Sequence, residues 1–320
     1  MKNESWYDVF INKLYEKHPQ KKHLIEALME MLSIEREAVY RRLRKEVSFT
    51  AEEMIIIAST WNISIDAIVA INAGKVPFQL EPTNYLNPSK EEIDLLHQRV
   101  KRLEHLAASR SSEYVVVSNN ISRSLAAGFE QIYKFNIFKW SYLYNRERNN
   151  LLFANVVIPE TINNEIMKYY KCMKNVKNTS YIFEYSIFEN IIRDIQFFQS
   201  IYLVSEEEKE LIKKELHALL DYLSNVAING CFPETNNKVQ IFISMINVNT
   251  NYSYFYTEEL KTCRIHAFHM HDIYSFDIET IEQFKIWMQL KKRTSILISE
   301  TDERRRIEFF SQQRQLINNL

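Results

Sequence analysis

The stretch Arg36-Glu-Ala-Val-Tyr-Arg-Arg-Leu-Arg-Lys45 decides the fold of the N-terminal region. It holds five basic residues and one acidic residue, whereas residues 1–80 as a whole carry 11 of each. Val39 and Leu43 are four residues apart, so they share one side of a helix and are predicted to point inward. The positive charge is therefore concentrated on the opposite, solvent-facing side of a single predicted helix.

Four further amphipathic helices are predicted around this one, within residues 4–72. Apolar residues recur there every three or four positions, which is the period of one face of a helix. Thr50-Ala-Glu-Glu53 is a capping box that opens the fourth helix, and Ser33 is placed to cap the charged helix, which we expect to end near Glu46. The residues predicted to face inward are Trp6, Phe10, Ile11 and Leu14, then Leu24, Leu28, Met31 and Leu32, then Val39 and Leu43, then Met54, Ile57, Ala58 and Trp61, and finally Ile65, Ile68 and Val69.

The order of these helices resembles a helix-turn-helix domain of the Cro/C1 (lambda-repressor-like) type. Leu24-Ile-Glu-Ala-Leu-Met-Glu-Met-Leu-Ser-Ile34 is similar to the scaffold helix and its turn, and the charged helix is similar to the recognition helix. Asn62-Ile-Ser-Ile-Asp-Ala-Ile68 is similar to the closing helix. This chain departs from the family in having Ser33 where glycine is usual and Met29 where a small residue is usual. The resemblance covers less than a quarter of the chain and implies sequence-specific binding to double-stranded DNA, usually as a dimer on a two-fold site.

The outward-facing residues of the helix over residues 35–46 form the candidate DNA-binding site. Arginine can donate two hydrogen bonds to guanine O6 and N7 in the major groove, and flanking basic side chains neutralise phosphates. We expect Tyr40, Arg41 and Arg44 to read base edges. The charge pattern leaves open the alternative of a solvated basic face, which is common on helical bundles. The candidate residues are Arg36, Glu37, Tyr40, Arg41, Arg44 and Lys45.

Beyond residue 73 the sequence predicts a linker region over residues 74–112. Three prolines are followed by a helix from 89 to about 111, whose apolar residues repeat with heptad spacing. This helix predicts either a parallel dimer contact or a surface helix packed on its own domain. The residues with heptad spacing are Ile93, Leu96, Val100, Leu103 and Ala107.

Residues 113–320 predict an α+β domain for regulation or oligomerisation. Strand-like apolar runs occur at 114–117 and 151–158, and residues 239–276 predict a small antiparallel sheet. Helices are expected at 160–174, 181–202, 205–228, 278–293 and 302–318. The fold class is thus mainly α, with a five-helix, lambda-repressor-like domain over residues 1–73, a linking helix and a larger α+β C-terminal domain.

Composition excludes several classes of protein. The chain has three glycines, each more than fifty residues from the next, so it holds neither a dinucleotide-binding Gly-x-Gly-x-x-Gly motif nor a P-loop. Three widely spaced cysteines predict neither a disulfide framework nor a zinc pair, and the net charge of −1 requires any nucleic-acid binding to be local. Without an N-terminal apolar segment or a run of 18 apolar residues, the sequence predicts a cytoplasmic protein that does not enter a membrane. No motif predicts enzymatic activity or a cofactor.

The sequence leaves two alternative functions open. His266, His269 and His271 lie close together, and in a strand His269 and His271 would share a face beside Asp272, as metal ligands can. The C-terminal domain would then bind metal or act as an enzyme, targeted by the helix-turn-helix. The near-neutral charge of residues 1–80 also fits a protein-interaction scaffold that does not bind DNA. We favour a dimeric, DNA-binding transcriptional regulator whose C-terminal domain senses a small-molecule or protein effector or mediates oligomerisation.

Overall fold

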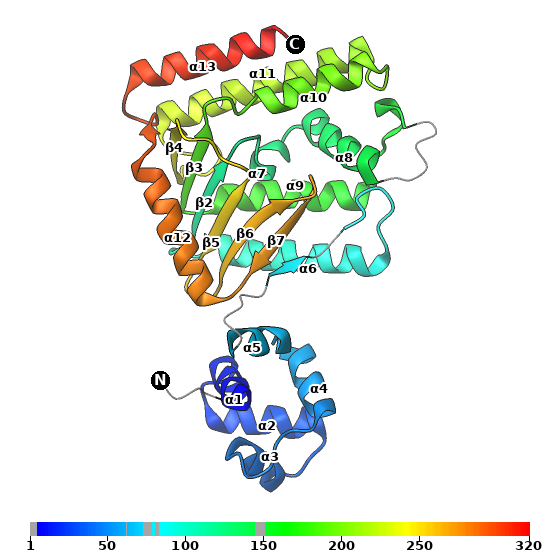
Figure 1. Cartoon of the computed structure of the whole chain (residues 1–320), viewed down its shortest axis with the longest axis vertical. Coiled ribbons are helices and arrows are strands. Elements are labelled where there is room, and N and C mark those ends of the chain that lie inside the picture. Colours follow the sequence, from blue (N-terminus) through cyan, green and yellow to red (C-terminus); the bar gives the residue numbers. More distant parts are fainter. Residues whose placement is uncertain (1–4, 62, 73–77, 81–82, 145–150) are drawn as a thin grey trace. The chain divides into compact units, whose positions relative to one another are not determined.

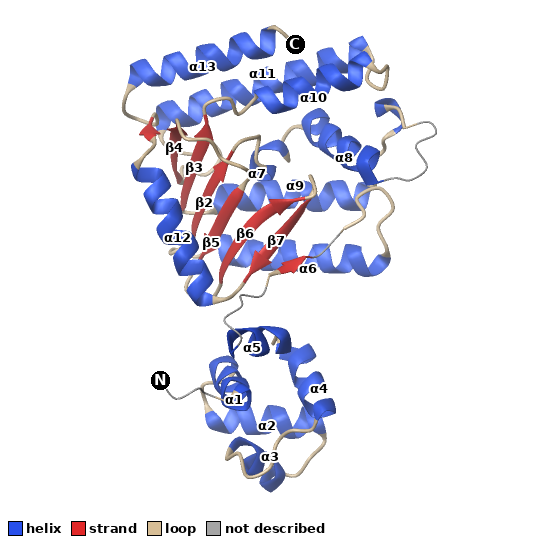
Figure 2. Ribbon diagram, in the orientation of Figure 1, coloured by secondary structure: helices blue, strands red, loops and turns tan. Residues whose placement is uncertain are grey.

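The computed structural model describes residues 5–61, 63–72, 78–80, 83–144 and 151–320. Contacts divide the chain into two compact units, Met1–Pro77 and Phe78–Leu320, each with a hydrophobic core of its own. Helices predominate in the described residues, and the second unit contains a β-sheet (Figures 1 and 2). The prediction of a mainly helical protein with β structure in its C-terminal part is confirmed.

The described part of the first unit forms five helices, whose apolar faces pack into one core. They are α1 (Trp6–Lys17), α2 (Lys21–Leu32), α3 (Arg36–Leu43), α4 (Ala51–Trp61) and α5 (Ile65–Asn72). Trp6 and Val69, which we predicted to face inward, are 46% and 57% exposed. Tyr7 is buried in place of Trp6, and Ile68, which was also predicted to face inward, is buried as expected. The completely buried side chains are Phe10, Leu14, Leu24, Leu28, Val39 and Ile57.

The start of α4 follows the predicted capping box. The Thr50 N–H donates to Glu53 Oε2 at 2.8 Å, and the Glu53 N–H donates to Thr50 Oγ1 at 3.2 Å. These two bonds satisfy backbone donors that have no partner within the helix. The prediction of a helix start at this position is therefore confirmed.

The turn between α2 and α3 differs from the prediction. Ser33 does not cap α3 but ends α2, with φ +52° and ψ +42° in the left-handed region, and Glu35 occupies the N-cap of α3. The helix also ends at Leu43 rather than near Glu46, because the chain turns at Lys45, which has a φ of +66°. Two left-handed residues thus limit α3 to eight residues.

The described residues of the second unit form an eight-stranded mixed sheet in the order β1-β7-β6-β5-β2-β3-β4-β8. The parallel strands are β2 (Glu113–Ser118), β3 (Asn178–Glu184) and β4 (Lys238–Ser244). The antiparallel strands are β1 (Gln79–Leu80), β5 (Tyr252–Tyr256), β6 (Lys261–Ala267), β7 (His271–Ser275) and β8 (Ile296–Leu297). The predicted small antiparallel sheet is therefore wrong in size and in type, because β2 and β3 join the strands of residues 239–276 through helical crossovers.

Two predicted elements of this unit are also wrong. Residues 181–202 were expected to be one helix, but β3 occupies residues up to Glu184 and α10 begins at Glu189. β3 is buried on both faces, so its sequence lacks the alternation that identifies a half-exposed strand. Residues 151–158 form a short 3-10 turn at Phe153–Asn155 instead of a strand, and their buried side chains join the core individually.

Helices cover both faces of the sheet. α12 (Ile278–Arg293) lies against β4, β5 and β6 over a small core that includes Val115, Val117 and Ile182. The opposite face holds the larger core, to which the remaining helices contribute buried side chains. These helices are α6 (Lys90–Ala107), α7 (Arg123–Ala126), α8 (Glu130–Tyr144), α9 (Glu160–Asn175), α10 (Glu189–Ser200), α11 (Glu206–Asn229) and α13 (Glu303–Asn318). The helices predicted at 160–174, 205–228, 278–293 and 302–318 are confirmed to within one residue at each end.

The helix with heptad spacing packs on its own unit. α6 lies along α9, and its residues Val100, Leu103 and Ala107 are buried in the larger core. Ile93 and Leu96 pack against the same core. The heptad seam is therefore occupied within the unit, as in the second of the two predictions made for this helix.

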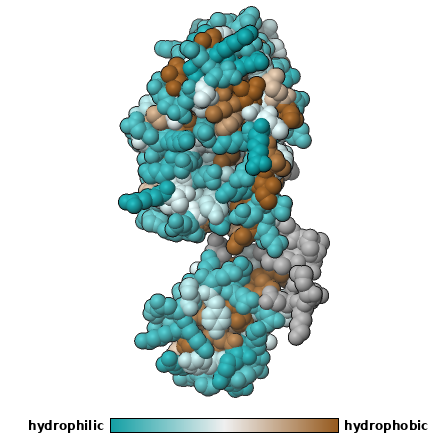
Figure 3. Space-filling model, turned by 90° about the vertical axis from the view of Figure 1, so that its left-hand side faces the viewer, coloured by the Kyte–Doolittle hydropathy of each residue, from teal (hydrophilic) through white to brown (hydrophobic). Residues whose placement is uncertain are grey.

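The outer side of α12 exposes large apolar side chains. α12 leaves Ile278, Ile286, Trp287 and Leu290 between 41% and 55% exposed. Figure 3, viewed from the side where α12 lies in Figure 1, shows hydrophobic patches among hydrophilic side chains on this unit. No helix in the described ranges is both long and apolar enough to cross a membrane.

Candidate nucleic-acid interface

The inner side of α3 is anchored in the core of the first unit. Val39 is completely buried and Leu43 is 6% exposed, as their spacing predicted. The segment after the helix is held by Tyr7, whose hydroxyl lies 3.3 Å from the Arg42 carbonyl and accepts a hydrogen bond from the Phe49 N–H at 3.0 Å. Burial raises the pKa of the Tyr7 phenol, so it stays protonated and can donate to the carbonyl.

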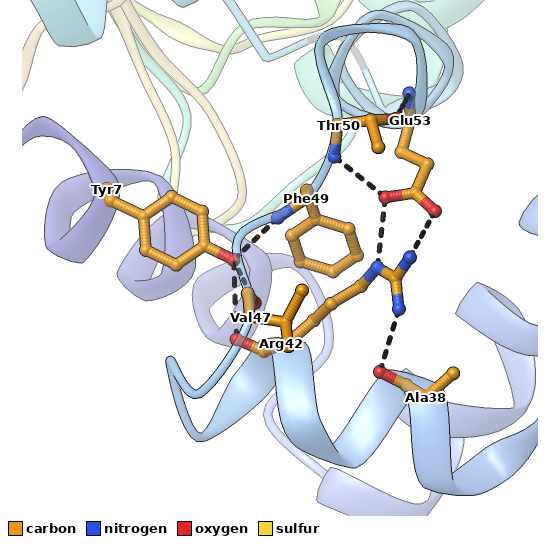
Figure 4. Close-up of polar contacts among 7 residues, drawn as sticks. All are labelled: Tyr7, Ala38, Arg42, Val47, Phe49, Thr50 and Glu53. Atoms are coloured by element: carbon orange, nitrogen blue, oxygen red, sulfur yellow. Dashed lines mark hydrogen bonds and ion pairs between the residues drawn. The ribbon is translucent and has the colours of Figure 1, made fainter.

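Arg42 is a structural residue rather than part of the exposed basic face. Its Nε donates to Glu53 Oε2 at 2.9 Å, its Nη2 to Glu53 Oε1 at 2.7 Å, and its Nη1 to the Ala38 carbonyl at 3.1 Å (Figure 4). Both charged side chains are about 15% exposed. Burial raises the pKa of Glu53, but the hydrogen bonds from Arg42 and Thr50 lower it by more. The pKa of Glu53 therefore lies below its usual value. This pair joins α3 to the start of α4.

The six predicted site residues lie on the outer side of α3 or just after it. Five of them are exposed, and Tyr40 is half-buried. Tyr40 lies under two cations, with Lys21 Nζ at 5.5 Å and Arg36 Cζ at 5.9 Å from the centre of its ring. Arg44 and Lys45 follow the last helical residue, so they extend the face beyond the helix.

Acidic side chains accompany three of the basic residues on this face. Arg44 pairs with Glu37 at 2.8 Å and with Glu46 at 3.2 Å, and Arg41 lies 3.8 Å from Glu46. Lys45 pairs with Asp8 of α1, and the hydrogen bond from Lys45 lowers the pKa of Asp8. The basic face is therefore partly neutralised by its own neighbours.

Sequence reasoning missed three residues that belong to this face: Asp8, Lys21 and Glu46. Glu46 follows the basic stretch directly, so the composition of residues 36–46 contained its signal. Asp8 and Lys21 come from α1 and α2, and the sequence contains no local pattern that brings them to α3.

The three histidines left open as metal ligands in the second unit do not form a metal site. His269 lies in the turn between β6 and β7, with a φ of +63°, so it does not share a strand face with His271. His271 is 7% exposed and stacks on Tyr85, whereas His266 Nδ1 lies 3.1 Å from Asp272 Oδ1. Among the residues that the structure describes, no group of three or more histidine, cysteine or acidic side chains could hold a metal ion.

The chain was compared with protein-family models, with curated proteins and with solved structures. None of these comparisons finds a match.

Proposed function

We propose that this protein is a cytoplasmic, sequence-specific DNA-binding transcriptional regulator that inserts α3 into the major groove. The observation that carries the proposal is the combination of a buried inner side and a polar outer side on α3. α3 follows α2 after a turn of three residues, Ser33, Ile34 and Glu35, which is a turn length typical of a helix-turn-helix. A helix is about 10–12 Å wide with its side chains, which fits a major groove about 12 Å wide.

The conformation of Ser33 supports the same proposal. Lambda-repressor-like domains usually have glycine at this turn, and Ser33 has a positive φ, the backbone conformation that glycine adopts most easily. The departure from the family pattern is thus a change of residue type with the glycine-like backbone retained. This agreement favours a helix-turn-helix over an unrelated bundle of five helices.

The ion pairs of the outer face are compatible with DNA binding. Exposed ion pairs contribute only about 0–1 kcal/mol each, so a phosphate or a base edge can replace an acidic partner at small cost. In the proposed complex Tyr40, Arg41 and Arg44 face base edges, whereas Arg36 and Lys45 neutralise phosphates. Glu37 and Glu46 then turn away from the DNA backbone, which repels them.

Exposed apolar side chains on the first unit are candidates for contact with a second copy. Ile55 of α4 and Val69 of α5 are 58% and 57% exposed, although each lies in a helix with a buried apolar face. A homodimer that covers these residues would present two copies of α3 to a two-fold symmetric site. The second unit would then serve for effector sensing or further oligomerisation.

The test is selection of bound fragments from genomic DNA by the full-length protein at near-physiological salt. We expect enrichment of an inverted repeat whose half-sites lie about one helical turn, 10–10.5 base pairs, or a multiple of it apart. Enrichment of a single half-site would retain DNA reading but contradict the dimer. Binding without sequence preference would contradict the proposal.

A further inference from the structure

One face of the sheet in the second unit carries a row of polar residues across four strands. Val117 pairs with Tyr252 and His266 pairs with Asp272, and the His266 N–H donates to the Asn251 carbonyl at 2.8 Å. Continuing this register places Ser118, Asn251, His266 and Asp272 side by side, and residues directly opposite each other share a face. The row lies at the carboxyl end of β2, where parallel sheets commonly bind ligands.

Arginines outnumber acids around this row. Arg123 of α7 lies 3.4 Å from Asp272, and His266 contacts the other carboxylate oxygen of Asp272. Arg264 of β6 is two residues before His266, so it lies on the same face of the sheet. It forms no ion pair within the ranges that the structure describes. Burial, together with the charges of Arg264 and Arg123, lowers the pKa of Arg99 of α6. Burial raises the pKa of Asp272, but the charges of Arg123 and Arg264 and the hydrogen bond from His266 lower it by more, so two guanidinium groups act on this one carboxylate.

Several buried polar atoms around the row have no hydrogen-bond partner in the described part of the chain. They include the hydroxyl oxygen of the completely buried Ser118 and the amide oxygens of Asn119 and Asn251. Trp140 Nε1 and His271 Nδ1, whose rings are in contact beside the β6–β7 turn, are also unpartnered. Folded proteins pair nearly all buried polar atoms, so these groups need hydrogen bonds from a ligand or from bound water.

The charged side chains beside these atoms are partly exposed. The side chains of Arg123, Asp272 and His266 remain 21% to 27% exposed, although they lie between the sheet and its helices. Buried tyrosines stand around them: Tyr85 donates to the Met270 carbonyl at 3.1 Å, and the same carbonyl accepts a bond from Arg123. Aromatic rings beside charged groups suit a ligand with both a polar and an apolar surface.

We propose that the face formed by Ser118, Arg123, Asn251 and Arg264 binds a small hydroxylated organic anion. Arg264 pairs with the phosphate or carboxylate group of the ligand, since arginine matches both groups with two parallel hydrogen bonds. The amide oxygen of Asn251 accepts a hydrogen bond from a hydroxyl group of the ligand. A sugar phosphate and a sugar acid share this chemistry. The use of the ligand as an effector of DNA binding rests on the proposed function, but the binding itself does not.

Calorimetric titration of the full-length protein without DNA tests the proposal. The probes are glucose 6-phosphate and gluconate, with glucose and inorganic phosphate as matched compounds that lack the charge or the hydroxyl groups. At constant ionic strength we expect saturable, one-to-one binding of at least one of the two sugar anions. Glucose and inorganic phosphate are expected to bind at least tenfold more weakly. The preference between the two sugar anions distinguishes a phosphate ligand from a carboxylate ligand.

Two variants locate the site. Arg264→Gln and Ser118→Ala are each expected to weaken binding at least fivefold. Arg193→Gln, which removes an exposed arginine of α10 and changes the net charge equally, is expected to leave it unchanged. Arg264 forms no ion pair among the described residues, and the Ser118 hydroxyl has no hydrogen-bond partner there, so neither variant is expected to lower the unfolding temperature of the free protein.

Four results would overturn the site. The first is that neither sugar anion saturates, and the second is that glucose or phosphate binds as tightly as they do. The third is that Arg193→Gln weakens binding as much as Arg264→Gln, and the fourth is that Ser118→Ala leaves binding unchanged. Because no DNA is present, these results are independent of the DNA-selection experiment, and either proposal can fail alone.

Discussion

Arg42 donates two hydrogen bonds to the carboxylate of Glu53 and thereby joins the last turn of α3 to the first turn of α4. Arg41, the preceding residue, points outward and is 55% exposed. Two adjacent arginines of one short helix therefore have different roles, and substitutions separate them.

Arg42→Ala is expected to destabilise the first unit by about 2 kcal/mol, because it leaves the half-buried Glu53 without its cation. Arg41→Ala is expected to change stability by less than about 0.5 kcal/mol, as for other surface substitutions. The measurement is the free energy of opening from hydrogen exchange of amides in α2 and α3. Equal effects of the two substitutions would show that the Arg42–Glu53 pair does not stabilise the unit.

Arg41→Ala is expected to weaken binding to the selected DNA site by about 1–3 kcal/mol and to relax the base preference at one position. Arg193→Ala, in α10 of the second unit, is the matched control and should leave affinity unchanged. Affinity is measured by fluorescence anisotropy at fixed salt concentration. An Arg41→Ala variant that retains full affinity and specificity would remove α3 from the proposed interface.

Glu46→Gln is expected to increase affinity for non-specific DNA about three- to fivefold. Glu46 pairs with both Arg41 and Arg44 in the free protein, and DNA must break these pairs to bind the two arginines. An exposed ion pair contributes up to about 1 kcal/mol. The affinity should also fall more steeply as the salt concentration rises, since more arginine side chains of the protein are then free to pair with phosphates and displace counterions from the DNA. Glu30→Gln is the matched control, because it removes an exposed carboxylate of α2 and changes the net charge equally. The same increase in both variants would mean that only net charge matters.

Ser33→Gly is expected to stabilise the first unit by about 0.5–1 kcal/mol, because glycine adopts a positive φ without the steric cost that serine has there. The same substitution at Ser59, an exposed residue within α4, should instead destabilise it by about 0.5–1 kcal/mol. Thermal unfolding and hydrogen exchange of each variant measure whether its stability rises or falls. Destabilisation by Ser33→Gly would mean that the turn is not left-handed in solution.

The stability of the first unit is expected to fall in acid, because the folded state lowers the pKa of Glu53. The stabilisation is fully present above the usual glutamate pKa of 4.5 and is lost as pH falls through the lower, folded-state pKa. Glu53→Gln should therefore cost more stability at pH 7 than at pH 3. Glu52→Gln, at the exposed neighbouring position, should show a smaller difference between the two pH values.

Local patterns in the sequence were sufficient for most of the helices. The capping box at Thr50 and Glu53 uses residues three apart, and the inward positions Val39 and Leu43 are one helical turn apart. Such interactions form within a single element, so the order of residues along the chain encodes them directly. The outward side of α3 was predicted for the same reason.

Other features depend on partners that are distant in sequence. β3 was read as part of a helix because a strand buried on both faces has no alternation, and its neighbours β2 and β4 are each about sixty residues away. The pairing of Lys45 with Asp8 across 37 residues also has no local signal. In both cases tertiary packing, rather than local preference, selects the structure.

The sequence by itself determined that the chain is mainly helical and that α3 turns a basic face outward, because both properties follow from spacings of three or four residues. It also determined that phosphate-binding glycine motifs are absent, because that property follows from composition. Only the tertiary structure decided which arginine is structural, where α3 ends, and that Ser118, Asn251, His266 and Asp272 share one face. Strand register brings together residues more than a hundred positions apart, and hydrogen bonding between strands fixes that register.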